Sequence, residues 1–149
     1  MDEKAQTPVI GSIMLLILAV LAWLLIGRVW KSDVAFCREV FEGLVNGNPS
    51  VASHIDWAHL QATGVNVGAT YASLPASQDQ WRYERTFIQK FAEGFRQAGG
   101  QLAAFRHWRV HAREDDRVVI AADDETKQKT LLLTVSATRP KKLEAMQWQ

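Results

Sequence analysis

The hydrophobic positions divide the chain into one long apolar run and a region of shorter patterned segments. The run, Val9–Gly27, contains no charged residue. As a helix rising ~1.5 Å per residue it extends about 28 Å, close to the thickness of a bilayer's hydrocarbon core. This predicts a tail over 1–8, a transmembrane helix over 9–30 and a domain over 32–149. The residues expected to anchor the helix are Val9, Leu16, Leu21, Trp23, Leu25 and Trp30.

A cleaved signal peptide is the alternative interpretation of this run. It is disfavoured because the chain begins Met-Asp-Glu-Lys rather than with basic residues, and no small-residue cleavage site follows Gly27. Lys4 precedes the run, whereas Arg28, Lys31 and Arg38 follow it. The positive-inside rule therefore predicts a single-pass protein of the cell membrane with its domain in the cytoplasm, and a periplasmic domain is the alternative.

Helical periodicity returns after the apolar run. Apolar residues at three- and four-residue spacing predict an amphipathic helix over Asp33–Asn46. Two short helices are expected near Ser50–His54 and Trp57–Ala62. A long helix is expected to open at Ser77 with a capping box and to end in a left-handed cap at Gly99-Gly100.

Beyond Gly100 the hydrophobic period changes to two, which is typical of strands. One face of the first strand reads Leu102, Ala104, Trp108, Val110 and Ala112, with Arg106 as the exception. Three more alternating segments follow, separated by short turns. The pattern predicts an α+β fold in which helices pack on a curved four-stranded antiparallel sheet with one buried face.

This order of elements resembles the NTF2-like superfamily, the cone-shaped domains that include SnoaL and ketosteroid isomerase. The resemblance rests on FCREVFEGLVNGN, on the loop HIDWAHL, on FRHWRV at the start of the sheet and on the element order. It implies helices folded over a concave sheet, often around a pocket. Its members include enzymes, binding or dimerisation modules that often pair through the sheet, and membrane-anchored components that face the periplasm.

Charge and cysteine content narrow the candidate functions. The predicted domain has 14 Lys and Arg against 14 Asp and Glu, so it lacks the positive excess of a nucleic-acid-binding domain. Cys37 is the only cysteine, so no intramolecular disulfide can form. It falls on the apolar face of its helix, which predicts a core thiol. No cofactor is predicted.

The segment around Asp56 contains the closest grouping of side chains that could take part in catalysis. This carboxylate is the only acidic or basic residue, histidines aside, between Gly43 and Gln78. His54 and His59 flank it and Tyr71 follows, so together they could form a general acid/base site. The alternative is that Asp56 caps a short helix beginning at Trp57.

No metal site is predicted. His107 and His111 lie about 13 Å apart on a strand rising ~3.3 Å per residue, too far to share one ion.

A basic stripe on the other face of the first strand is the candidate binding surface. It consists of Phe105, His107, Arg109, His111 and Arg113, and the cationic turns Lys127–Lys129 and Arg139–Lys142 are expected to extend it. It could dock an acidic partner or anionic headgroups, or form a homodimer. The alternative is an ordinary solvated face whose charges pair with Asp123 or Glu114.

Two functions follow. The favoured one is a membrane-tethered, non-catalytic module that docks a protein or itself through its sheet. If this function is correct, the side chains of Trp81, Phe91, Phe95 and Trp108 should fill the interior of the cone, and Phe105 should be exposed. The alternative is a small-molecule pocket protein or a dehydratase- or isomerase-type enzyme. It requires Asp56 or His54 to line a cavity of about 300 Å³ or more.

Overall fold

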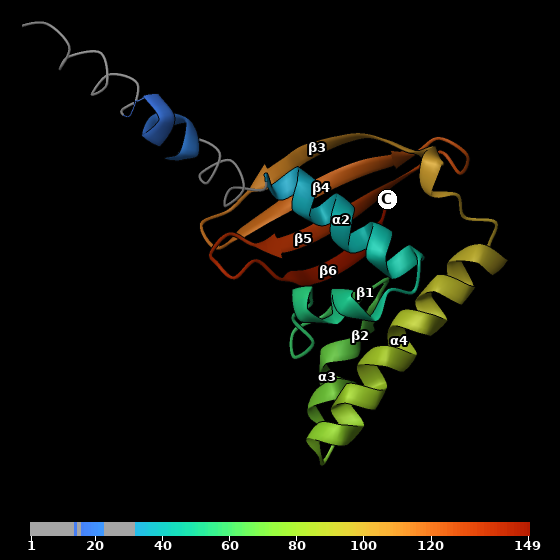
Figure 1. The fold of residues 1–149 in the computed structure, drawn as a ribbon. Helices are drawn as coiled ribbons and strands as arrows, with labels where there is room; N and C mark the ends of the chain where they lie inside the picture. Colours follow the sequence, from blue (N-terminus) through green and yellow to red (C-terminus); the bar gives the residue numbers. More distant parts are fainter. Residues whose placement is uncertain (1–13, 15, 23–31) are drawn as a thin grey trace, which may run out of the picture. The chain divides into compact units, whose positions relative to one another are not determined.

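A computed structural model describes residue 14, residues 16–22 and residues 32–149 (Figure 1). The chain separates into Met1–Ser32 and Asp33–Gln149. Within the described part of the first unit, residues 14 and 16–22 are helical, and Leu16 and Leu21 are at least half exposed. The predicted anchors Val9, Trp23, Leu25 and Trp30 lie outside the described residues.

The structure corrects the membrane prediction. Among the described residues, no helix combines the length and the apolar character needed to cross a membrane. The transmembrane helix over 9–30 and the single-pass localisation are therefore overturned.

The second unit contains three α-helices and two short 3-10 helices: α2 (Asp33–Val45), η1 (Pro49–His54), α3 (Val67–Ala72), α4 (Ser77–Gln97) and η2 (Leu102–Ala104). The predicted amphipathic helix is confirmed as α2, and η1 matches the first short helix. The second is wrong, because a turn follows Trp57 and a strand begins at Gln61. The capping box is also wrong, because Ala76 is the N-cap of α4 and makes no side-chain hydrogen bond there.

All six strands belong to one sheet: β1 (Gln61–Ala62), β2 (Val65–Asn66), β3 (Phe105–Arg113), β4 (Arg117–Asp124), β5 (Lys129–Ser136) and β6 (Leu143–Trp148). Their order is β2-β1-β6-β5-β4-β3. The predicted meander is present as β3–β6, but β1 pairs parallel to β6 and antiparallel to β2. The predicted four-stranded antiparallel sheet is therefore wrong, and the fold is α+β with a six-stranded mixed sheet.

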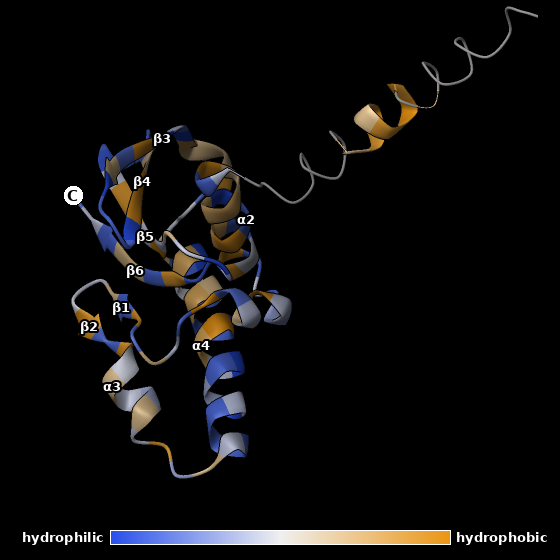
Figure 2. Ribbon diagram, turned by 90° about the vertical axis from the view of Figure 1, so that its left-hand side faces the viewer, coloured by the Kyte–Doolittle hydropathy of each residue, from blue (hydrophilic) through white to orange (hydrophobic). Residues whose placement is uncertain are grey.

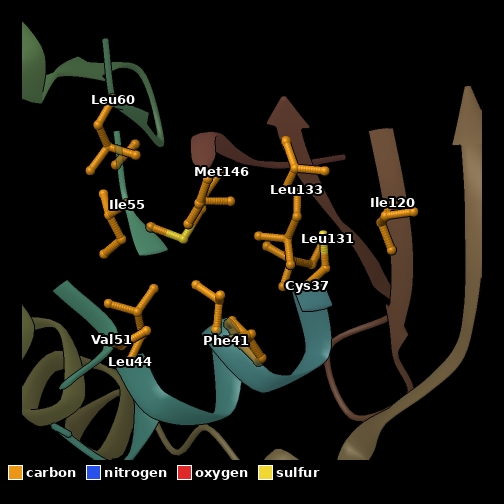
Figure 3. Packing of buried hydrophobic residues seen from close by; sticks show 14 of the residues in the cluster. Cys37, Phe41, Leu44, Val51, Ile55, Leu60, Ile120, Leu131, Leu133 and Met146 are labelled. Carbon is orange, nitrogen blue, oxygen red and sulfur yellow. The ribbon is translucent and has the colours of Figure 1, made fainter. Parts of the chain in front are cut away.

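The core lies between α2 and one face of the sheet, here called the inner face (Figures 1 and 3). Figure 3 shows Cys37 of α2 close to Leu131 of β5, and Leu44 farther along the helix beside Val51. Phe41 is fully buried, and four other rings surround it, with centroids 4.8 to 6.5 Å away. Cys37 has no exposed surface, which confirms the predicted core thiol, and burial raises its pKa to about 12.

Two irregularities change the direction of side chains along β3. Arg106 pairs with Asp123 and Arg109 with Ala121, so two β3 residues, His107 and Trp108, face a single position of β4. His107 has φ of +53°, as a bulge residue often does. A second shift lies between Val110 and Ala112. Each extra residue reverses the alternation, so Phe105 and Arg113 turn to the inner side against the prediction, whereas Arg109 and Val110 keep their predicted faces.

The N-terminal half of α4 extends away from β3–β6, with α3 beside it (Figures 1 and 2). Aromatic side chains join these two helices to the domain. Trp57 stacks on Tyr71 at 6.0 Å between ring centroids, and the Tyr71 hydroxyl donates a 2.9 Å hydrogen bond to Glu84. Trp81 remains 55% exposed and packs under Arg85, so it does not fill the predicted cone.

Candidate functional site

The face of β3–β6 turned away from α2, here called the outer face, is defined by strand register. Core residues occupy alternate positions, such as Ile120, Leu133 and Met146, which pair across β4, β5 and β6. The residues between them therefore point outward. They are Arg106, Arg109 and Ala112 on β3, Arg117, Val119, Ala121 and Asp123 on β4, Thr130, Leu132, Thr134 and Ser136 on β5, and Ala145 and Gln147 on β6. Within Asp33–Gln149, α2 covers the opposite face only (Figure 2).

The centre of the outer face consists of small or apolar side chains. Ala121 and Leu132 are almost fully buried, while Val119, Thr134 and Ala145 are half-buried. No charged side chain lies among these five. Small side chains allow another sheet to approach to the usual separation of about 10 Å.

The structure separates the residues of the predicted basic stripe. Phe105 is 6% exposed and packs on Phe41 and Trp148, so it belongs to the core and not to a surface. Arg113 turns to the inner side and pairs with Asp33 of α2 at 3.2 Å. His107, Arg109 and His111 stay exposed. The five residues therefore do not form one surface, because the two β3 irregularities direct them to different sides.

The cations of the outer face have carboxylate partners within the domain. Arg109 bonds Asp123 through two nitrogens, at 2.9 and 3.2 Å, and His107 lies 3.6 Å from the same carboxylate. Arg106 lies 3.5 Å from Glu125. At the other end of β4, Arg117 lies 3.0 Å from Glu144. The face therefore presents paired charges of both signs. The pairing with Asp123 is the one expected if the stripe is an ordinary solvated face.

Of the predicted acid/base group, the structure brings together Asp56 and His59. The carboxylate Oδ2 of Asp56 and the ring Nδ1 of His59 lie 2.9 Å apart, and the His59 side chain is 75% exposed. The other two members lie elsewhere: His54 packs edge-on against Phe36, and Tyr71 bonds Glu84. Asp56 precedes a turn, not a helix, so its predicted capping role is wrong.

A cavity of about 500 Å³ lies beside His59, between the outer face and α3. Its lining combines polar side chains, including Arg117 and Glu144, with small residues of α3 and with Thr134 and Ala145 of the outer face. Neither Asp56 nor His54 lines it. An imidazole held by a carboxylate beside a cavity can act as a general base, so the arrangement suits proton transfer to or from a bound molecule.

The predicted extension of the basic stripe is not found on the outer face. Lys141 pairs with Asp33, and the Lys142 ammonium group donates to the carbonyl of Ser53. Lys127 and Lys129 line an apolar groove with Phe91, Phe95 and Trp148. This groove was missed because its residues come from separate parts of the chain, although an aromatic residue every four positions along α4 marks one of its walls.

Within residues 14, 16–22 and 32–149, no group of three or more His, Cys, Asp or Glu side chains is arranged to hold a metal ion. No protein-family model, curated protein or solved structure matches the chain. Membership of the NTF2-like superfamily therefore stays a prediction. The functional argument has to come from the outer face, the Asp56–His59 pair and the cavities themselves.

Proposed function

We propose that Asp33–Gln149 is a non-catalytic assembly module that self-associates by packing the outer face of its sheet against the same face of a second copy. The observation that carries this proposal is the outer face itself. It spans β3–β6, α2 packs on the opposite face, and Val119, Thr134 and Ala145 form an uncharged centre, of which Thr134 and Ala145 also border the cavity beside α3.

The charges around this centre favour a second copy over an acidic partner. The carboxylates of Asp123, Glu125 and Glu144 already neutralise the arginines of the face. A two-fold interface must be complementary to itself, and a surface with paired charges of both signs does not repel its own copy. A partner recognised by basic charge would instead require unpaired cations.

The side chains also suit the packing of one sheet on another. Two sheets pack about 10 Å apart when their facing residues are small enough to interdigitate. Alanine, valine and threonine at the centre meet this condition, and the longer Leu132 and Gln147 pair with each other beside them. The pairing would cover a face that each copy otherwise exposes.

Sedimentation velocity over a range of protein concentrations tests the proposal. The variant Thr134→Arg with Ala145→Arg places like charges opposite each other in the interface. Such charges cost several kcal/mol, so the dimer Kd should rise roughly tenfold or more. The matched control Gln78→Arg with Arg82→Lys alters the exposed start of α4 and should leave the Kd unchanged.

Circular dichroism and thermal melts of both variants establish that they are folded. A folded outer-face variant that associates as strongly as the unmodified chain would overturn the proposal. So would an unmodified chain that is monomeric at every concentration.

A second candidate function is a small-molecule pocket protein or an isomerase-type enzyme. The observation that favours it is His59, which lies 2.9 Å from Asp56 and lines the cavity of about 500 Å³. Asp56→Asn should leave self-association intact under the first proposal. The second gains support if small ketones or carboxylates shift the His59 imidazole resonances saturably in the unmodified chain and not in Asp56→Asn.

A further inference from the structure

An apolar groove lies on the inner side of the sheet, between the C-terminal half of α4 and the ends of β5 and β6. Its volume is about 390 Å³. Phe91, Phe95 and Trp148 supply its aromatic lining, and Gly94 and Ala98 leave space along the α4 wall. Small-molecule sites typically start near this size and are mostly apolar, with a few polar groups that fix orientation.

The aromatic lining is held in place by the core behind it. The Phe95 and Phe91 rings meet Phe41 edge-on at 5.9 and 6.5 Å between centroids. The Trp148 ring lies 5.8 Å from that of Phe105. Because Phe41 and Phe105 are buried, the groove is formed before any ligand arrives, and binding has little ordering cost.

Three lysines surround the groove. Lys90 projects from α4, while Lys127 and Lys129 come from the turn between β4 and β5 and from the start of β5. All three are exposed, and within the part of the chain that the structure describes their ammonium groups form no ion pair.

The acidic groups near the groove have other partners. Asp124 is buried; burial alone would raise its pKa, but hydrogen bonds from Thr126 and from the Lys127 backbone, together with the charge of Lys127, outweigh this and lower it. Glu125 pairs with Arg106, and Glu93 accepts a hydrogen bond from Gln97. The rim of the groove is therefore cationic, while its floor is apolar.

We propose that this groove binds a small anionic amphiphile, a molecule with a short alkyl or aromatic body and one carboxylate. The apolar body would lie on Phe91, Phe95 and Trp148, and the carboxylate would reach Lys90 or Lys129. An acidic peptide fits less well, because peptides usually occupy extended grooves or sheet edges. The site lies on the opposite side of the sheet from the outer face and does not depend on self-association.

The test uses the ¹⁵N-labelled 149-residue chain and the indole N–H resonance of Trp148, assigned with Trp148→Phe. Decanoate, decyltrimethylammonium and acetate are titrated separately. Decanoate should shift the Trp148 resonance saturably, and the other two should not, since one has the wrong charge and the other has no apolar body. The indoles of Trp57 and Trp81 serve as internal controls.

Two sets of variants locate the ligand. Lys90→Gln with Lys129→Gln should weaken decanoate binding roughly threefold to tenfold, as expected for two partly exposed ion pairs. Arg82→Gln, elsewhere on α4, should have no effect. A Cβ at Gly94 would meet no atom within 4 Å, so Gly94→Leu should fill the groove and abolish binding while Gly94→Ala retains it.

The proposal is overturned if decanoate produces no saturable shift at Trp148, or if decyltrimethylammonium binds as tightly. It is also overturned if Gly94→Leu binds decanoate as Gly94→Ala does. A shift produced by a Glu- and Phe-rich peptide but not by decanoate would reassign the groove to peptides and reject the small-molecule ligand.

Discussion

Arg109 on the edge strand β3 donates two hydrogen bonds to the Asp123 carboxylate on β4, at 2.9 Å to Oδ2 and 3.2 Å to Oδ1. The hydroxyl of Thr130 on β5 donates a third, at 3.0 Å. One carboxylate thus connects three neighbouring strands across the outer face. It also neutralises Arg109, a cation of the basic stripe predicted from the sequence.

These contacts predict how Asp123 titrates. The hydrogen bonds from Arg109 and then Thr130 lower its pKa below the ordinary value. Its contribution to stability is therefore present above the unfolded-state value of about 3.9 and is lost as the pH falls through the folded-state pKa. Arg109→Gln should raise the Asp123 pKa, as measured by carboxyl ¹³C NMR.

Arg82→Gln is the control for this titration, because Arg82 pairs with Asp79 on α4 and should leave Asp123 unchanged. An Asp123 pKa that does not move in Arg109→Gln would show that the Arg109 bonds seen here contribute little in solution.

Phe105 and Val110 should respond to truncation in the opposite order from the one the sequence pattern predicts. Phe105 is buried among three rings, whereas Val110 is 41% exposed. Phe105→Ala should lower the free energy of unfolding by about 3–5 kcal/mol, and Val110→Ala by under about 1 kcal/mol. Urea unfolding of the two variants measures the difference, and equal losses would contradict the observed bulge at His107.

Two helical glycines should respond in opposite ways to alanine. A Cβ at Gly68 in α3 would lie 2.3 Å from the carbonyl oxygen of Ala58, a backbone atom that cannot easily move. At Gly94 in α4 the space is open. Gly94→Ala should stabilise the fold by up to about 1 kcal/mol through helix propensity. Gly68→Ala should destabilise it by about 1–3 kcal/mol through overpacking. A Gly68→Ala variant as stable as the unmodified chain would place α3 farther from Ala58.

Cys37 should be unreactive in the folded chain. Thiol reagents attack the thiolate, and burial raises the pKa of this group to about 12. At pH 8 a disulfide reagent such as DTNB should label Cys37 slowly in buffer and quickly in concentrated urea, as followed by absorbance. Rapid labelling of a chain with native circular dichroism would show that α2 opens readily from the sheet.

Where one residue pattern continued through a whole element, the sequence predicted it well. The three- and four-residue spacing of Val40, Phe41 and Leu44 identified α2, and Gly99, with φ of +71°, ends α4 as expected. In β5, alternation placed Leu131, Leu133 and Val135 in the core. These features depend on neighbours along the chain, which is why they can be read from it.

The errors have long-range or local geometric causes. β1 and β2 are two residues each, too short to show a period, and β1 exists because it pairs with β6 far along the chain. The bulge at His107 does not disturb the alternation of hydrophobic residues along β3. Its one sign in the sequence is Arg106, which interrupts the face predicted to be apolar. The Asp56–His59 pair could be anticipated from sequence proximity, but the cavity beside it could not.

Self-association through the outer face is tested most directly by a distance between copies. A single spin label at Gln147→Cys, in a Cys37→Ala background, sits on the outer face opposite Leu132. Pulsed electron–electron double resonance should give one narrow distribution of short distances between the labels of the two copies, and this signal should disappear in the Thr134→Arg variant. A label at Gln78→Cys should give a longer distance between copies. No dipolar signal at Gln147, or a distance unchanged by Thr134→Arg, would contradict the account.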